Sequence, residues 1–75
     1  MPASPASPRA IFASNVAHIR ERKGLTQEQL GWNAGIHQTA VARVESGDRM
    51  PTLATILKIA EGLEVPPADL FAGID

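Results

Sequence analysis

Three polar side chains that can hydrogen-bond to nucleic-acid bases lie close together in the chain: the amide of Gln38, the hydroxyl of Thr39 and the guanidinium of Arg43. On a helix that turns about 100° per residue they share one arc with small residues, whereas Val41 and Val44 take the other side. In the major groove of DNA, glutamine pairs bidentately with adenine and arginine with guanine. We therefore predict a helix that reads DNA. The alternative is a solvated face, which would more often carry Glu and Lys at i,i+4 spacing.

The helix that carries these residues, about His37 to Ser46, is preceded by signals for a second short helix. Thr26 can cap that helix through its hydroxyl, and Gln29 three positions later completes a capping box. Gly31 has no side chain and lets another helix cross closely. Gly35 stands where the helix must stop, because glycine enters the left-handed region at no steric cost. Two helices that meet steeply across a short glycine-containing turn form a helix-turn-helix unit.

Three further helices are expected around this unit. The Ser-Pro pair at residues 7–8 is a good cap and first turn, the Pro-Thr pair at 51–52 begins another helix, and the proline pair at 66–67 opens a short last one. No segment alternates like a strand. We therefore predict an all-α fold, a compact five-helix domain over residues 8–75, preceded by a flexible tail rich in Pro, Ser and Ala at residues 1–7.

Apolar spacing assigns an inward face to two of these helices. In the first, Phe12, Val16 and Ile19 repeat at i, i+4 and i+7. In the fourth helix the mostly inward positions are expected to be Leu53, Ile56, Leu57, Ala60 and Leu63.

A domain of this size buries only about 60% of its unfolded surface, so its stability is expected to be modest.

Composition removes several classes of function. The chain has no cysteine, which excludes a disulfide framework and a thiolate metal site, and its two histidines at positions 18 and 37 make no metal-ligand set. We expect neither a metal nor a cofactor. No nucleophile, base and orienting group come together, and no glycine-rich phosphate loop is present, so an enzyme is not expected. No segment approaches the roughly 18 apolar residues that span a membrane, and we expect a cytoplasmic protein.

Net charge is the main argument against DNA binding, because the formal charge is -1. The charges are, however, unevenly distributed. Up to residue 57 six basic side chains stand against four acidic ones, and from Lys58 onward one stands against four. If the acidic end faces away from DNA, a usable face with weak non-specific attraction remains, which favours a paired, sequence-reading mode over general coating.

Four segments together resemble the phage lambda repressor and Cro-type helix-turn-helix family, which is XRE-like. They are FASNVAHIRERKGLTQEQL, NAGIHQTAVARVESG, MPTLATILKIAEGL and VPPADLF, and they extend from about Phe12 to Phe71. The length and the AGIH start of the second motif helix most resemble the controller proteins of restriction–modification systems. The resemblance implies a lambda-repressor-like fold and a sequence-specific transcriptional regulator, a homodimer on a palindromic DNA operator, with its own promoter as one expected target.

The resemblance also implies roles for particular residues. Gln27 and Gln38 match two glutamines at the starts of the paired helices, of which one supports the other and contacts a phosphate while its partner reads a base. Thr39 and Arg43 match further groove-facing positions. The expected base-reading residues are therefore Gln38, Thr39 and Arg43.

Phosphate contacts are expected from Gln27, Thr52 and Arg49. The first two stand at helix starts, where free N–H groups attract anions. Arg49 is chosen by its family position in the loop, and the alternative for it is a freely solvated arginine. Arg20 and Glu45 match a pair that in this family joins the first helix to the recognition helix by a largely buried salt bridge, so their expected role is structural.

Four positions depart from the family pattern, and one of them is Ser46, which replaces the more usual Asn before Gly47. His37 stands where a Ser or Thr cap is usual, which predicts a weak cap, with a pH sensor or phosphate contact as the alternative. Glu64 stands where a helix-ending Gly is common, so this turn is either strained or built differently around Gly62. Trp32 occupies a position that is usually charged; a partly exposed packing role is expected, with contact to the DNA backbone or to a protein as alternatives.

Dimer formation is inferred from the family and from the short reach of a single recognition helix, since twofold pairing places two such helices about 34 Å apart on successive major grooves. Leu70, Phe71 and Ile74 form an apolar C-terminal cluster that could be the isologous contact. The alternative is a lid on the core of the monomer. A second hypothesis for the whole protein is a protein-binding module, such as an antitoxin or a regulatory subunit, which uses Trp32 and the C-terminal residues.

Overall fold

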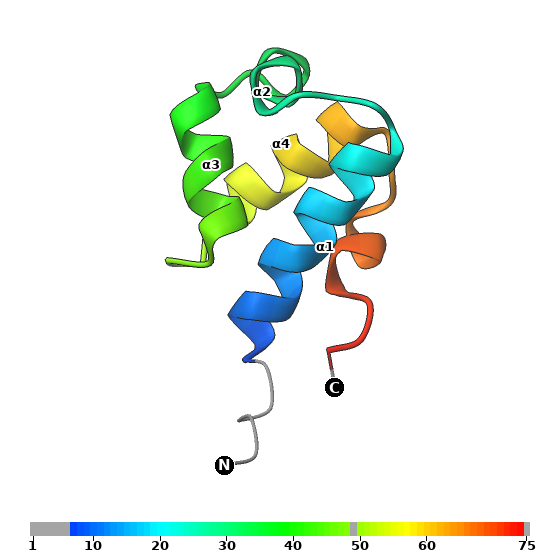
Figure 1. The fold of residues 1–75 in the computed structure, drawn as a ribbon. Coiled ribbons are helices and arrows are strands. Elements are labelled where there is room, and N and C mark those ends of the chain that lie inside the picture. Colours follow the sequence, from blue (N-terminus) through cyan, green and yellow to red (C-terminus); the bar gives the residue numbers. More distant parts are fainter. Residues whose placement is uncertain (1–6, 49, 75) are drawn as a thin grey trace.

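The computed structural model describes residues 7–48 and 50–74, and within them the chain forms α-helices and one 3-10 helix (Figure 1). The predicted tail therefore lies outside the described residues except for Ser7, and so does Arg49. The elements in chain order are α1 (Pro8–Arg22), α2 (Gln27–Ala34), α3 (Gln38–Ser46), α4 (Leu53–Leu63) and the 3-10 helix η1 (Pro67–Phe71).

The helices place α3 and η1 on opposite sides of α1 (Figure 1). α1 packs against both α3 and η1, and α2 packs against α3 and α4. α4 begins beside α3 and runs away from it, so the acidic segment after Lys58 lies on the far side from α3. This arrangement keeps the acidic part of the chain apart from α3.

A single cluster of apolar side chains joins all these elements. Removing this much apolar surface from water is the main term that stabilises so small a fold. The largest side chains that are completely buried are Phe12, Val16, Leu30, Val41, Ile59, Leu63 and Leu70.

The inward face of α4 differs from the prediction. Leu53 is 69% exposed and Leu57 is 47% exposed, although both were expected to be mostly inward. Ile59 is completely buried instead. At about 100° per residue, Ile56, Ile59 and Leu63 lie within one arc of the helix, and this arc faces the core. Leu57 lies outside that arc and faces solvent.

The fifth helix was predicted without its type, and the structure makes it a 3-10 helix of five residues. The amide of Asp69 donates to the carbonyl of Pro66 at 3.0 Å, a bond with the short i to i+3 reach. Pro66 and Pro67 have no N–H to donate, and Gly73 follows with a φ of 85°. The described part of the chain thus has four α-helices and this short element in place of five regular helices.

The start of α2 and its turn into α3 follow the prediction closely. The hydroxyl of Thr26 accepts from the amide of Gln29 at 3.0 Å, and the amide of Thr26 donates to Oε1 of Gln29 at 2.8 Å. Gly35 ends α2 with a φ of 72°. A Cβ on Gly31 would lie 2.7 Å from the carbonyl oxygen of Ile36, so only glycine lets the chain cross here.

The end of α4 resolves the question about Glu64. Its backbone is left-handed, with φ 58° and ψ 44°, and it is the one non-glycine residue with positive φ in the described chain. The amide of Val65 donates to the carbonyl of Ala60 at 3.0 Å, which closes the kind of turn that a glycine usually makes. The strained alternative is therefore the one that the structure adopts.

Replacing Glu64 with glycine is expected to raise the free energy of unfolding by roughly 0.5–1 kcal/mol, because relief of left-handed strain exceeds the added entropy of the unfolded chain. Urea denaturation followed by circular dichroism measures this change. Glu61→Gly is the matched control: it lies inside the same helix and should lower stability by about 1 kcal/mol. Losses of similar size in both variants would contradict the strain at Glu64.

Candidate nucleic-acid interface

α3 is a short helix held at both ends by local hydrogen bonds. Nδ1 of His37 accepts from the amide of Thr39 at 3.0 Å and so caps its first turn. Gly47 ends the helix with a φ of 75°. The hydroxyl of Ser46 donates to the carbonyl of Arg43 at 2.7 Å. The expected weak cap is thus a formed one, made by an imidazole nitrogen where a hydroxyl is more usual.

The two faces of α3 differ as the sequence indicated. Val41 and Val44 are buried against the core, whereas Gln38, Thr39 and Arg43 are exposed. None of these three exposed side chains makes a hydrogen bond or ion pair with any other residue that the structure describes. They are therefore free to bind groups outside the protein.

An open groove of about 940 Å³ runs beside this face, between α3 and the start of α4. Thr39 and Arg43, predicted to read bases, line this groove together with Thr52, predicted to bind phosphate. Gln38 does not line the groove. The carboxylate of Asp48 also borders the groove and would repel a phosphate close to it. The lining residues are His37, Thr39, Ala40, Arg43, Val44, Asp48, Met50, Pro51, Thr52 and Thr55.

Two of the predicted phosphate-binding side chains have partners inside the protein. The hydroxyl of Thr52 accepts a hydrogen bond from the backbone amide of Thr55 at 3.2 Å. It also donates one to the hydroxyl of Thr55 at 3.1 Å. The side-chain nitrogen Nε2 of Gln27 donates to Oε1 of Glu45 at 3.1 Å. Among the described residues, no hydrogen bond joins the side chain of Gln27 to that of Gln38. Of the three candidates, Arg49 lies outside the described residues.

The ion pair between Arg20 and Glu45 is formed in the structure. Nε and Nη2 of Arg20 donate to the two carboxylate oxygens of Glu45 at 2.7 and 3.0 Å. Nη1 of Arg20 donates to the carbonyl of Leu25 at 2.6 Å, and only 14% of the Arg20 side chain and 7% of the Glu45 side chain are exposed. The pair joins α1, the loop before α2, and α3.

Hydrogen bonding to Glu45 raises the pKa of Arg20 above its ordinary value, against the lowering effect of burial. The negative charges of Glu45 and Glu21 add to the rise. Arg20 therefore keeps its charge in this mostly buried position, and that charge needs its carboxylate partner.

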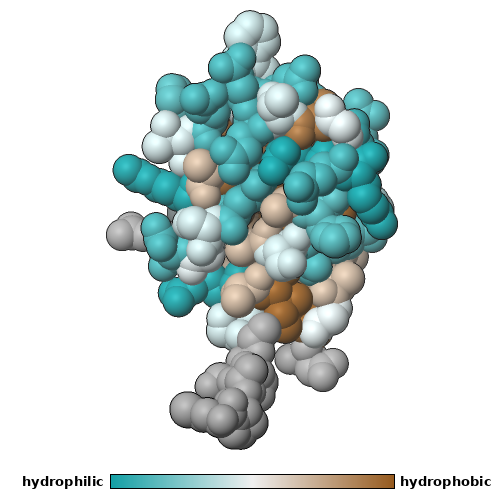
Figure 2. Space-filling model, in the orientation of Figure 1, coloured by the Kyte–Doolittle hydropathy of each residue, from teal (hydrophilic) through white to brown (hydrophobic). Residues whose placement is uncertain are grey.

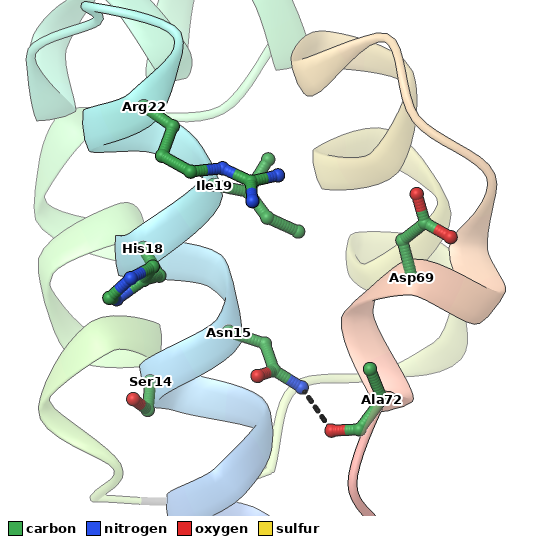
Figure 3. A pocket seen from close by; sticks show the side chains of 7 residues that line it. All are labelled: Ser14, Asn15, His18, Ile19, Arg22, Asp69 and Ala72. Atoms are coloured by element: carbon green, nitrogen blue, oxygen red, sulfur yellow. Dashed lines mark hydrogen bonds between the residues drawn. The ribbon is translucent and has the colours of Figure 1, made fainter.

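A second hollow, of about 420 Å³, lies between α1 and η1 (Figure 3). The amide nitrogen of Asn15 points from α1 toward η1 and donates to the carbonyls of Leu70 and Ala72, each at 2.9 Å. The guanidinium of Arg22 and the carboxylate of Asp69 lie on opposite sides of the hollow. The hydrogen bonds of Asn15 fasten the C-terminal segment to α1, a contact that the sequence analysis did not predict.

The C-terminal cluster divides between core and surface. Leu70 is completely buried, so it takes the role of a lid on the monomer core and offers no surface to a partner. Phe71 is half-buried against Phe12, with the ring centroids 5.3 Å apart, and Ile74 is half-buried as well. Figure 2 shows an apolar area where the first turn of α1 meets the C-terminal segment, on a surface that is otherwise largely hydrophilic.

Trp32 does not pack on a neighbouring helix. It is 82% exposed, the highest value among the large apolar side chains described, so the expected packing role is wrong. Leu30 and Ala34 on the opposite side of α2 face the core. Its alternatives, contact with DNA or with a protein, stay open.

Other kinds of site receive no support from the described structure. Within residues 7–48 and 50–74, no group of three His, Asp or Glu side chains is placed to hold a metal ion. None of the helices described there is long and apolar enough to cross a membrane. The exposed face of α3 is the best-supported candidate site.

Comparison with known proteins identifies the family. The model of the family HTH_3, described as helix-turn-helix, matches residues 16–70, which include α2, α3 and α4 in full. The chain belongs to this helix-turn-helix family. Within it, α2 and α3 are the two helices of the motif, and the resemblance predicted from the sequence is confirmed.

Several known proteins are similar to this chain over most of its length. Control protein C.BamHI of Bacillus amyloliquefaciens is 35% identical over 64 residues, which cover 84% of this chain and 79% of that protein. The uncharacterized HTH-type transcriptional regulator y4dJ of Sinorhizobium fredii is 36% identical over 67 residues, covering 89% and 87%. The crystal structure of the restriction–modification controller protein C.AhdI from Aeromonas hydrophila matches with a TM-score of 0.80 and 37% identity, covering 83% of this chain and 94% of that one.

Replacing Glu45 with alanine in this HTH_3 protein is expected to lower the free energy of unfolding by about 3 kcal/mol, because the charge of Arg20 would stay mostly buried without its partner. The double change Arg20→Met, Glu45→Leu should recover most of that loss, since it removes both charges. Urea denaturation measures both, and Glu61→Ala, an exposed carboxylate, should change stability by less than about 0.5 kcal/mol. A loss as small as that of Glu61→Ala would show that the pair is not structural.

Proposed function

We propose that this DNA-binding transcriptional regulator lays α3 in the major groove of double-stranded DNA and reads base edges with Gln38, Thr39 and Arg43. The observation that carries the proposal is the exposed face of α3, where these three side chains have no partner among the described residues. An amide and a guanidinium among small neighbours suit adenine and guanine. Such a role belongs to the cytoplasm, where the DNA is, and it involves no catalysis.

Phosphate contacts would set the position of α3 on the duplex. The backbone N–H groups at the starts of α2 and α4, at Gln27 and Thr52, suit a phosphate even though both side chains have internal partners. Arg49 supplies the charge in the proposal. Contacts of this kind carry no sequence information, so their loss should weaken binding to every duplex alike.

We propose a homodimer that binds a twofold-symmetric operator. One helix reads only a few base pairs, and a symmetric pair would place two α3 helices about 34 Å apart. The contact assigned here is Phe71 with Ile74, on the opposite side of α1 from α3, so that pairing leaves both α3 helices free. Because controller proteins are among the similar proteins, we propose that this protein regulates a restriction–modification system or the promoter of its own gene.

Selection of bound duplexes from a random pool is expected to enrich a twofold-symmetric motif. Gln38→Ala and Arg43→Ala should each weaken binding by about 1–3 kcal/mol and relax the preference at particular bases, whereas Arg49→Ala should weaken binding to all sequences. Binding curves on the selected and a scrambled duplex measure both effects. If all three variants acted equally on the two duplexes, the assigned readout would be wrong.

Sedimentation equilibrium tests the dimer. Ile74→Glu is expected to shift the protein from dimer to monomer at a given concentration, because it buries a carboxylate in an apolar contact. Leu57→Glu is the matched control, an exposed apolar residue on α4. Dissociation by Leu57→Glu and not by Ile74→Glu would move the contact to α4, and a monomeric wild-type protein would exclude the dimer.

A protein-binding module is the second candidate function, and the exposure of Trp32 favours it. A largely exposed indole is unusual on a soluble domain and common in protein contacts. A stoichiometric partner that co-purifies with the wild-type protein and is lost with Trp32→Gln would support this function. The absence of any enriched DNA motif at moderate salt would favour it over the first.

A further inference from the structure

His37 caps α3 with an aromatic ring nitrogen. Its backbone is extended, with φ -71° and ψ 147°, and Nδ1 lies 3.0 Å from the amide nitrogen of Thr39. An amide N–H can only donate, so Nδ1 must hold a lone pair in this bond. The ring that makes this cap is therefore the neutral imidazole.

The cap also determines which nitrogen carries the hydrogen. A neutral imidazole has one N–H and one lone pair, and with the lone pair at Nδ1 the hydrogen is at Nε2. The side chain is exposed, and no acceptor within residues 7–48 and 50–74 takes a hydrogen bond from Nε2. A serine or threonine cap ends at the hydroxyl that makes the bond, whereas the imidazole extends beyond the cap and ends in a donor.

The position of this donor suits the backbone of a bound duplex. His37 lines the groove between α3 and α4 together with Arg43 and Thr52. It precedes the first turn of α3, so it lies beside the exposed reading face and not within it. Among the described residues that line the groove, Arg43 carries a charge that attracts a phosphate and Asp48 one that repels it.

We propose that His37 is a positioning residue for DNA: Nδ1 caps α3, and the Nε2–H group donates a hydrogen bond to a phosphate oxygen of the duplex. The proposal rests on the proposed function of α3 and adds a contact that carries no base information. It combines the two roles that the sequence left as alternatives, since the cap itself directs the hydrogen outward. A neutral donor of this kind would fix the start of α3 relative to the strand without adding positive charge.

The neutrality of His37 gives the proposal its test. A protein group that neutralises a phosphate releases counterions and steepens the salt dependence of binding, by about 0.9 in the logarithmic slope per contact, and a neutral donor does not. We would measure binding of the selected duplex from 50 to 300 mM salt at pH 8, where an ordinary imidazole is neutral. The proteins are the wild type, His37→Ser, His37→Asn and Arg49→Ala.

His37→Ser and His37→Asn should keep the thermal stability of the wild type, because both residues are good caps. Each should bind about tenfold more weakly, the usual effect of one hydrogen bond to a charged group, with an unchanged salt slope. Arg49→Ala, the variant at the proposed phosphate-binding arginine, should reduce the slope by about 1. Wild-type affinity in both His37 variants would reduce His37 to a cap, and a slope reduced by about 1 would make it a cation; either result overturns the proposal.

Duplexes with single methylphosphonate groups locate the contact. One position should weaken the wild type by about tenfold and leave His37→Ser unaffected. If His37→Ser instead altered the preference at one base pair, His37 would be a base-reading residue and the phosphate assignment would be wrong. A wild-type protein without any sequence-specific binding would refute the function of α3 itself, which is a separate outcome from equal binding by the wild type and the variants.

Discussion

The bidentate pair of Arg20 and Glu45 is the contact on which the orientation of α3 depends. Each oxygen of the carboxylate accepts from the guanidinium, and one also accepts from Gln27. The remaining guanidinium nitrogen is bound to the carbonyl of Leu25. A planar guanidinium in this arrangement has little rotational freedom. α1, α2 and α3 are consequently fixed to one another by polar groups at the edge of the apolar core.

A steric constraint acts with this polar one. The carbonyl of Ile36 comes so close to Gly31 that any side chain there would collide with backbone, which cannot move aside as a flexible side chain could. The ion pair and the glycine crossing therefore restrict α3 from two directions, while its outer face is left without a structural task. This division explains how a chain of 75 residues can hold an exposed polar helix face in a fixed orientation.

Features that depend on neighbours within a few residues could be predicted from the sequence. The capping box of Thr26 and the two faces of α3 follow from local hydrogen bonds and helix periodicity. The pairing of Arg20 with Glu45 spans 25 positions, and only the family resemblance indicated it. The bond from Asn15 to Leu70 spans 55 positions and leaves no periodic trace. The exposure of Leu57 and Trp32 likewise depends on which surfaces of α4 and α2 the other elements cover, and the spacing of apolar residues alone does not determine this.

The exposure of Trp32 has an optical consequence. The chain contains one tryptophan and no tyrosine, so nearly all of its near-ultraviolet absorption and emission comes from this indole. Unfolding ordinarily shifts tryptophan fluorescence because it moves the ring from the core into water. Here the ring is already in water in the folded state. The emission wavelength of Trp32 should therefore change little when this protein unfolds. The same emission should respond to any molecule that binds to the outer face of α2 and covers the indole.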